Sequence, residues 1–179
     1  MKLVILDHNG VINQVSSTYI KTPDEWKPIA GSMEAIARLT HAGYRVVIAS
    51  NQSSIGRGLL DMSTFHAIND KMFRSVQQAG GRIDALFFCP NAQNDKCTCR
   101  KPGIGMFLEI KQRYSTELSH VPAIGDSLRD LEAAYQAGAI PILVLTGKGE
   151  ATYAAGDLPP GTQVFPDLAT AVDSLVIRA

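Results

Sequence analysis

The stretch LVILDHNGVIN (3–13) decides the fold. Its apolar run, Leu3–Leu6, predicts a short buried strand, and Gly10 predicts a tight turn directly after it. The strand therefore delivers Asp7 to a turn, where a carboxylate is placed to attack or to bind something. Two residues later, where a second acid would suit that chemistry, the chain has Asn9. Whether this turn is catalytic depends on what the rest of the chain brings to it.

Short apolar runs alternate with helix-periodic segments through the remainder of the chain. Ser32 and Ser63 are expected to cap the first two helices. The alternation predicts right-handed βαβ units and therefore an α/β fold with a mainly parallel sheet between two helical layers. We expect further strands at 44–50, 85–89, 122–126, 141–145 and 162–165, and helices at 31–43, 63–78, 105–114, 127–138 and 167–176.

Length and charge narrow the class of protein. The 179 residues suit one domain, 1–179, with a cysteine-rich metal loop at 89–103. Lys plus Arg equals Asp plus Glu at 17 each, so there is no net positive charge that would favour binding to a nucleic acid or a membrane surface. No basic segment precedes the first apolar run, which predicts a cytoplasmic protein without a secretory signal. No interface pattern stands out, and we expect a monomer.

Four segments are expected to meet at one edge of the sheet, because parallel strands bind ligands at their carboxyl ends. They are LDHNG, ASNQS, CRKP and GDSLRD. Asp7 can act as a nucleophile, and Asp126 can join it in holding Mg²⁺. Asp130 is expected to be a first-turn helix acid or a support rather than a metal ligand.

The other two segments supply donors for a phosphoryl group. The hydroxyl of Ser50 and the amide or backbone of Asn51 can donate to phosphoryl oxygens, and Lys101 adds a compact positive charge. Arg100 presents a planar fork suited to a second phosphate or to sugar hydroxyls. A carboxylate nucleophile, a divalent cation and such donors are what phosphoryl transfer through an aspartyl-phosphate requires.

These motifs resemble the haloacid dehalogenase (HAD) superfamily, whose members form aspartyl-phosphates on a Rossmann-like sheet. Within it, LDHNGVIN, SNQSSIGRGL, CTCRKP and GDSLRDLEAA are similar to the heptose-1,7-bisphosphate 7-phosphatases and to histidinol-phosphate phosphatases. The resemblance implies Asp7 as nucleophile and a three-layer HAD fold without a large cap domain. It implies removal of the 7-phosphate of D-glycero-D-manno-heptose 1,7-bisphosphate, in the supply of precursors for the lipopolysaccharide core. A histidinol-phosphate phosphatase and a non-catalytic sugar-phosphate-binding homologue are the alternatives.

The same resemblance assigns the supporting residues. Ser50 and Lys101 would stabilise the transferring phosphoryl group, and Mg²⁺ would be held by Asp7, the backbone carbonyl of Asn9 and Asp126. The residues Asn51, Gln52, Ser53 and Arg100 would contact the substrate. Without a cap, loops must shape the open site, and the segment 14–19 and Arg57 are candidate contacts.

Asn9 is the first departure from the family pattern, Asp-x-Asp-Gly. The second Asp protonates the leaving oxygen and later activates water, and an amide does neither, so turnover is expected to fall by roughly 10²–10⁴-fold. Three explanations remain open: a change introduced to trap a complex, a natural change in a repurposed homologue, or replacement of the acid by His8, whose imidazole titrates in the right range. Deamidation at Asn9-Gly10 could also restore a carboxylate.

The cysteines carry the second departure. Cys89, Cys97 and Cys99 fall within eleven positions, which favours metal or redox chemistry over a disulfide framework. Relatives with a structural zinc site have Cys-x-His followed by Cys-x-Cys, and here Asn91 stands at the histidine position. We expect a three-cysteine zinc site completed by water or Asn91, a partly empty site, or three free thiols.

Overall fold

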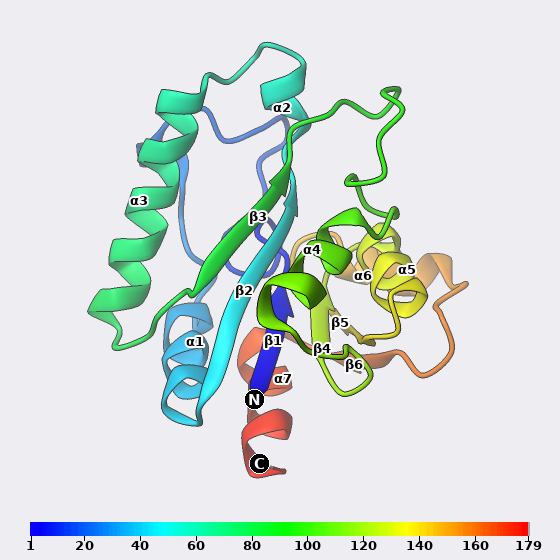
Figure 1. Ribbon diagram of the computed structural model, residues 1–179. Coiled ribbons are helices and arrows are strands. Elements are labelled where there is room, and N and C mark those ends of the chain that lie inside the picture. Colours follow the sequence, from blue (N-terminus) through cyan, green and yellow to red (C-terminus); the bar gives the residue numbers. More distant parts are fainter. Residues whose placement is uncertain (179) are drawn as a thin grey trace.

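Six parallel strands form one sheet in the computed structural model, which describes residues 1–178 (Figure 1). The order across the sheet is β3-β2-β1-β4-β5-β6, and every neighbouring pair is parallel. The strands are β1 (Lys2–Leu6), β2 (Tyr44–Asn51), β3 (Ala85–Cys89), β4 (Pro122–Gly125), β5 (Ile140–Val144) and β6 (Gln163–Phe165). The predicted α/β class with a parallel sheet is confirmed, and residues 1–178 contain no separate cap domain.

Helices cover both faces of this sheet. Three of them pack together on one face: α1 (Ser32–His41), α3 (Met62–Gln78) and α7 (Leu168–Ile177). The other face carries α4 (Gly105–Tyr114) and α5 (Leu128–Gln136), and α6 (Gly149–Ala155) lies beside α5 (Figure 1). Two short helices, η1 (Pro23–Glu25) and α2 (Ser53–Gly56), interrupt the loops.

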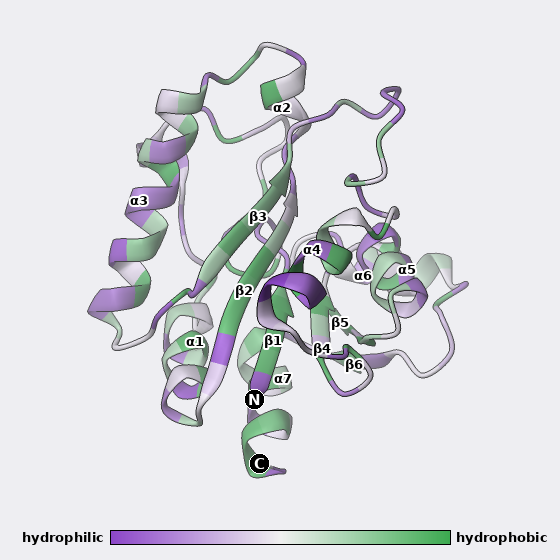
Figure 2. Ribbon diagram, in the orientation of Figure 1, coloured by the Kyte–Doolittle hydropathy of each residue, from purple (hydrophilic) through white to green (hydrophobic). Residues whose placement is uncertain are grey.

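Strand β1 shows why the apolar runs fold this way. Val4 and Leu6 pack into the core under α1 and α3, while Leu3 and Ile5 pack into the core under α4. Side chains alternate across a strand, so a strand covered on both faces must be apolar throughout. Figure 2 accordingly shows the central stretches of β1, β2 and β3 in green, as hydrophobic. None of the helices within residues 1–178 is long and apolar enough to cross a membrane.

Helix starts differ from the sequence prediction at two places. Gly31 precedes α1 in the left-handed region, with φ +86°, and Ser32 is already helical. The Ser32 hydroxyl donates instead to the carbonyl of Val11 at 2.9 Å, which ties α1 to the turn after β1. At α3 the cap is Asp61, whose carboxylate accepts from the backbone N–H of Thr64 at 2.7 Å. Both predicted serine caps are therefore wrong.

Candidate active site

The carboxyl ends of β1 and β4 lie side by side at the centre of the sheet. The chain runs outward from β1 to β2 and β3, then crosses back to β4, so this is where the strand order reverses. Asp7 follows β1 and its N–H donates to the carbonyl of Ile124 at 2.9 Å, while Asp126 follows β4. Ligands of open α/β sheets bind at such a switch point.

Three carboxylates and one ammonium group occupy this point. Oxygens of Asp7, Asp126 and Asp130 all lie within 4.8 Å of one another. The Nζ of Lys101 is 3.0 Å from Oδ1 of Asp7 and 2.6 Å from Oδ1 of Asp130, and it also donates to the carbonyl of Ala49 at 2.7 Å. Lys101 is only 3% exposed, so a single buried cation faces three acidic groups.

This imbalance shifts the pKa of each group. Burial, and then the charge of Asp130, raise the pKa of Asp7 to about 7 and that of Asp126 to about 6. Burial acts in the same direction on Asp130, but Lys101 outweighs it and lowers the pKa of this carboxyl. Burial alone would lower the pKa of Lys101, yet Asp130 and Asp7 raise it. The cluster lacks positive charge, and carboxylate oxygens are the donors that Mg²⁺ prefers.

Backbone and hydroxyl groups fix the two acids that follow β4. Ser127 and Asp130 form a capping box at the start of α5, with Asp130 accepting from the Ser127 hydroxyl at 2.9 Å. The backbone N–H of Lys148 donates to Oδ2 of Asp126 at 2.9 Å. A Cβ atom at Gly10 or Gly147 would collide with that carboxylate, so both glycines allow the backbone to approach it. Asp130 thus lies in the first turn of α5, as predicted, and its ion pair with Lys101 is an additional contact that was not predicted.

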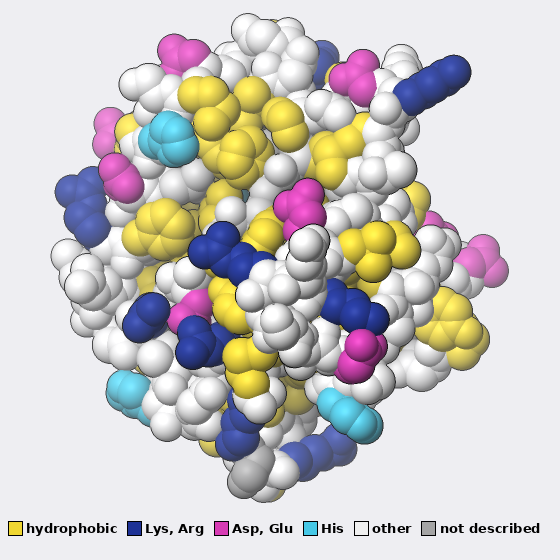
Figure 3. Space-filling view, viewed as in Figure 1, with side chains coloured by type: hydrophobic (Ala, Val, Ile, Leu, Met, Phe, Trp, Pro, Cys, Tyr) yellow, Lys and Arg dark blue, Asp and Glu magenta, His cyan; other side chains and the backbone are white. Residues whose placement is uncertain are grey.

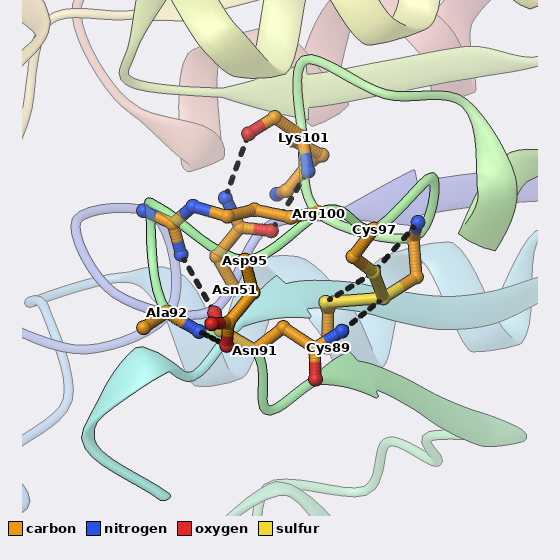
Figure 4. The surroundings of a disulfide bond; sticks show 9 residues. Asn51, Cys89, Asn91, Ala92, Asp95, Cys97, Arg100 and Lys101 are labelled. Atoms are coloured by element: carbon orange, nitrogen blue, oxygen red, sulfur yellow. Dashed lines mark hydrogen bonds between the residues drawn. A yellow bond between two sulfur atoms is a disulfide. The ribbon is translucent and has the colours of Figure 1, made fainter. Parts of the chain in front are cut away.

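Asn51 holds the loop that carries Lys101. Its Oδ1 accepts from the backbone N–H of Lys101 at 2.9 Å, and its Nδ2 donates to the carbonyl of the same residue at 3.1 Å (Figure 4). The side-chain amide is therefore occupied, which leaves the backbone of Asn51 for any contact with a phosphoryl oxygen. Gln52 donates from Nε2 to the Ser50 hydroxyl at 2.9 Å.

The three cysteines gather in the loop just before Lys101. Their sulfur atoms lie within 4.8 Å of one another, and Cys89 is fully buried (Figure 4). Cys99 approaches both Cys89 and Cys97 within bonding range, and one sulfur can form only one disulfide. Asn91 points its Nδ2 toward the Cys99 sulfur at 3.9 Å. Three converging thiols suit a soft or borderline metal such as Zn²⁺, whereas an amide nitrogen does not ligate it.

A cavity of about 210 Å³ opens above the carboxylates. It is lined by the expected residues Asp7, Asn9, Ser50, Asn51, Gln52, Ser53, Arg57, Arg100, Lys101 and Asp126, and by Val15, Ser16, Thr18 and Tyr19 from the predicted loop. Gln14 and Ser17 of the same segment are not among the lining residues. Arg129 and Lys148 also line it and were not predicted, although Arg129 lies inside the motif GDSLRD and Lys148 follows β5.

The rim of the cavity is cationic. Arg57, Arg100, Arg129 and Lys148 form no ion pair with any residue between 1 and 178. Burial and the charge of Arg129 lower the pKa of Arg100, so the two guanidinium groups are close enough to repel each other. Elsewhere the charge is dispersed: Figure 3 shows Lys and Arg side chains scattered between apolar and neutral ones, without a continuous basic patch on that face.

Asn9 lines two cavities, and His8 lines only the smaller of them. Asn9 lines the main cavity, and its Oδ1 accepts from Nδ2 of Asn13 at 2.9 Å. His8 is 2% exposed and lines a smaller cavity of about 30 Å³, with Nδ1 3.5 Å from Nε2 of Gln52. Burial and the charge of Lys101 lower the pKa of His8 to about 4, so the imidazole is neutral at pH 7. The ring is not among the groups that line the main cavity.

A parallel sheet with an acid cluster and a lysine at its switch point defines a HAD-like hydrolase. Two family models match the chain: "Polynucleotide kinase 3 phosphatase" over residues 3–128 and "HAD-hydrolase-like" over residues 98–171. A D-glycero-beta-D-manno-heptose-1,7-bisphosphate 7-phosphatase from Bordetella bronchiseptica is 54% identical over the whole of both chains. The enzyme of the same name from Neisseria meningitidis is 48% identical, over 94% of this chain and 91% of the relative.

Solved structures agree with the sequence matches. The D,D-heptose 1,7-bisphosphate phosphatase of B. bronchiseptica, solved with magnesium and phosphate, superimposes with a TM-score of 0.99 over 100% of both chains, at 54% identity. The D,D-heptose 1,7-bisphosphate phosphatase of Burkholderia thailandensis gives a TM-score of 0.80 at 48% identity, over 98% of this chain and 99% of that enzyme's chain. The chain belongs to the D-glycero-D-manno-heptose-1,7-bisphosphate 7-phosphatase family of HAD-like hydrolases.

Proposed function

We propose that this protein removes the 7-phosphate of D-glycero-D-manno-heptose 1,7-bisphosphate with Mg²⁺ as cofactor, at a rate reduced by Asn9. The observation that carries the proposal is the buried cluster of Asp7, Asp126 and Asp130 around Lys101, at the strand ends of a family fold. Hydrolysis of the bisphosphate would supply the heptose monophosphate for lipopolysaccharide core precursors.

In this proposal Asp7 is the nucleophile. One carboxylate oxygen forms a bond to phosphorus while the bond between phosphorus and the sugar oxygen breaks, and the sugar oxygen takes up a proton. Water then attacks phosphorus in the aspartyl-phosphate, which releases orthophosphate and restores the carboxylate. The Ser50 hydroxyl and the Lys101 ammonium group donate to the phosphoryl oxygens, where charge develops.

The Mg²⁺ ligands in this proposal are Asp7, Asp126 and the backbone carbonyl of Asn9. The raised pKa values of both acids support it, because a cation that offset their repulsion would let both ionise at neutral pH. When bound, Mg²⁺ neutralises charge on the phosphoryl oxygens. An amide in place of the family's acid leaves the carbonyl of residue 9 in place, so metal binding is expected to survive.

The second phosphate of the substrate is expected at the cationic rim. Arg57, Arg100, Arg129 and Lys148 face the same cavity as Asp7, and guanidinium groups bind phosphate through two parallel hydrogen bonds. Gln52 and Ser53 also line this cavity and would contact the substrate. A phosphomonoester with no second anion would leave these cations unpaired, which favours a bisphosphate over histidinol phosphate.

Reversion of Asn9→Asp tests the function. Turnover of the heptose bisphosphate should rise by roughly 10²–10⁴-fold, since the carboxyl restores proton transfer to the leaving oxygen. A parallel assay with histidinol phosphate serves as the specificity control, and preference for it would overturn the substrate assignment. If turnover stays unchanged in the revertant, the rest of the site is not arranged for catalysis, and the alternative of a non-catalytic sugar-phosphate-binding protein stands.

We further propose a structural zinc ion held by Cys89, Cys97 and Cys99, with water or the amide oxygen of Asn91 in the fourth position. Clamping this loop would fix Arg100 and Lys101, which follow directly in the chain. Metal analysis of protein purified without chelator should give close to one equivalent of zinc, and Cys97→Ser should lose it. Zinc far below one equivalent would refute the site. Asn91→His should tighten it, because imidazole is a zinc ligand and an amide is a poor one.

A further inference from the structure

The amide of Asn13 has only one possible orientation. Its Nδ2 lies 3.1 Å from the backbone carbonyl of Gln14, and a carbonyl can only accept a hydrogen bond. The same nitrogen lies 2.9 Å from the side-chain oxygen of Asn9. Asn13 is fully buried, so water does not compete for these contacts. Both hydrogens of the nitrogen are therefore used, one on each acceptor.

This arrangement fixes the amide of Asn9 in turn. Because Asn13 donates to it, Asn9 must present its oxygen on that side. Its own nitrogen, with two N–H donors, is then the group left for the two cavities that Asn9 lines, the main one above the carboxylates and the smaller one beside His8. An ionised carboxyl at position 9 would bring acceptors and a negative charge to a cavity that already contains Asp7, Asp126 and Asp130. The amide brings donors without charge.

We propose that Asn9, held by Asn13, donates hydrogen bonds to an anionic phosphoryl oxygen, and that the site retains phosphate more tightly than the same site in an Asn9→Asp variant. Asn9 is then a binding residue, and Asn13 is a positioning residue that acts through it. The chain would keep its phosphorylated ligand or its phosphate product, where a rapid phosphatase must release it. The inference rests on the proposed function, since it places the phosphoryl group beside Asp7.

Calorimetric titration with inorganic phosphate in excess Mg²⁺ tests the binding role without any need for turnover. Asn9→Ala should raise the Kd for phosphate about tenfold, which corresponds to about 1.4 kcal/mol, through loss of the donor. At a pH at which the introduced carboxyl is ionised, Asn9→Asp should raise the Kd further, because repulsion is added to that loss. A Kd for Asn9→Asp equal to or below that of the unmodified protein at that pH would overturn the inference, as would an unchanged Kd for Asn9→Ala.

The test of Asn13 must distinguish a positioning role from a general loss of structure, and a comparison in two backgrounds does so. Asn13→Ala should weaken phosphate binding several-fold in the unmodified protein and have no effect in the Asn9→Ala background. Equal weakening in both backgrounds would show that Asn13 does not act through Asn9 and would refute the positioning role. Asn13→Ser replaces Asn13→Ala if the latter does not fold, and the same two backgrounds give the same discrimination.

The proposed function and this inference can fail separately. If Asn9→Asp hydrolyses the heptose bisphosphate rapidly but phosphate binds all variants equally, the proposed phosphatase function stands and the proposed tighter binding of phosphate by Asn9 is refuted. If phosphate with Mg²⁺ binds the unmodified protein and weakens as described, while Asn9→Asp remains inactive, the inference holds and the catalytic proposal falls. Absence of phosphate binding by the unmodified protein overturns the inference.

Discussion

Replacing Lys101 by Met should destabilise the metal-free protein in a way that depends strongly on pH. Lys101 is 3% exposed, and its Nζ lies 3.0 Å from Asp7 and 2.6 Å from Asp130. At an effective dielectric constant of about 20, each such pair interacts by about 5.5–6.4 kcal/mol, which the burial of the three charged groups partly offsets. Removing one partner of a buried ion pair typically costs about 3–5 kcal/mol, and we expect that loss at pH 8.

The loss should shrink as the pH falls. In the unmodified protein Lys101 holds the pKa of Asp130 below its ordinary value, so the pair contributes stability above that value. Without Lys101, burial and the neighbouring acids raise the pKa of Asp130 above it. The folded variant then binds a proton that the unfolded chain releases, and it regains about 1.4 kcal/mol for each pH unit below the new pKa. At pH 5 the loss should be less than half of that at pH 8.

Urea denaturation in EDTA at pH 5 and pH 8 measures both values. Lys111→Met is the matched control, because Lys111 pairs with Glu117 at 2.8 Å but both side chains are exposed. That control should lose less than about 1 kcal/mol at either pH. Equal losses for the Lys101 variant at the two pH values would refute the electrostatic explanation and leave packing of the lysine stem as the cause.

Three further predictions concern the turn after β1. Gly10→Ala should abolish Mg²⁺ binding by calorimetry, because its Cβ collides with Asp126, whereas Gly43→Ala, also at positive φ but with nothing within 4 Å, should cost only about 1–2 kcal/mol of stability. The pKa of His8, lowered to about 4, should reduce stability by up to about 3 kcal/mol as the pH falls from 6.5 to 4, and a His8→Gln variant should lack that slope. Peptide mapping should find Asn9 deamidated slowly in the folded protein and quickly in urea, because the Gly10 nitrogen that must attack its side chain donates to the carbonyl of Asn13 at 2.8 Å.

The sheet and its functional edge were predictable because their signals are local. Parallel strands buried on both faces are short apolar runs, and the polar residue that ends each run marks the ligand-binding edge. Asp7, Ser50 and Asp126 line one cavity, as these local signals predict. The helix caps were less predictable. Ser32 is the residue type that usually caps a helix, but its hydroxyl donates to the carbonyl of Val11, and Gly31 is the N-cap of α1.

Contacts between distant segments could not be read from the sequence. The amide of Asn51 looks free to bind substrate until the fold places it against the backbone of Lys101, 50 positions away. Arg129 and Lys148 come from different segments and share the cavity only because β4 and β5 are neighbours. Short α6 was missed, since Gly149–Ala155 has too few apolar residues to show a helical period.

The metal-binding carboxylates of the site are distinct from the side chain at residue 9, where proton transfer is expected to be lost. Three carboxylates close to one ammonium group are costly in the absence of a cation, as the raised pKa values of Asp7 and Asp126 indicate. A chain that needed no metal would be more stable with one of these acids neutralised. Their presence together therefore argues for continued binding of a divalent cation. Asn9 changes neither acid and leaves its own carbonyl available, so we expect it to act on proton transfer and on phosphoryl binding and to leave the metal site unaffected.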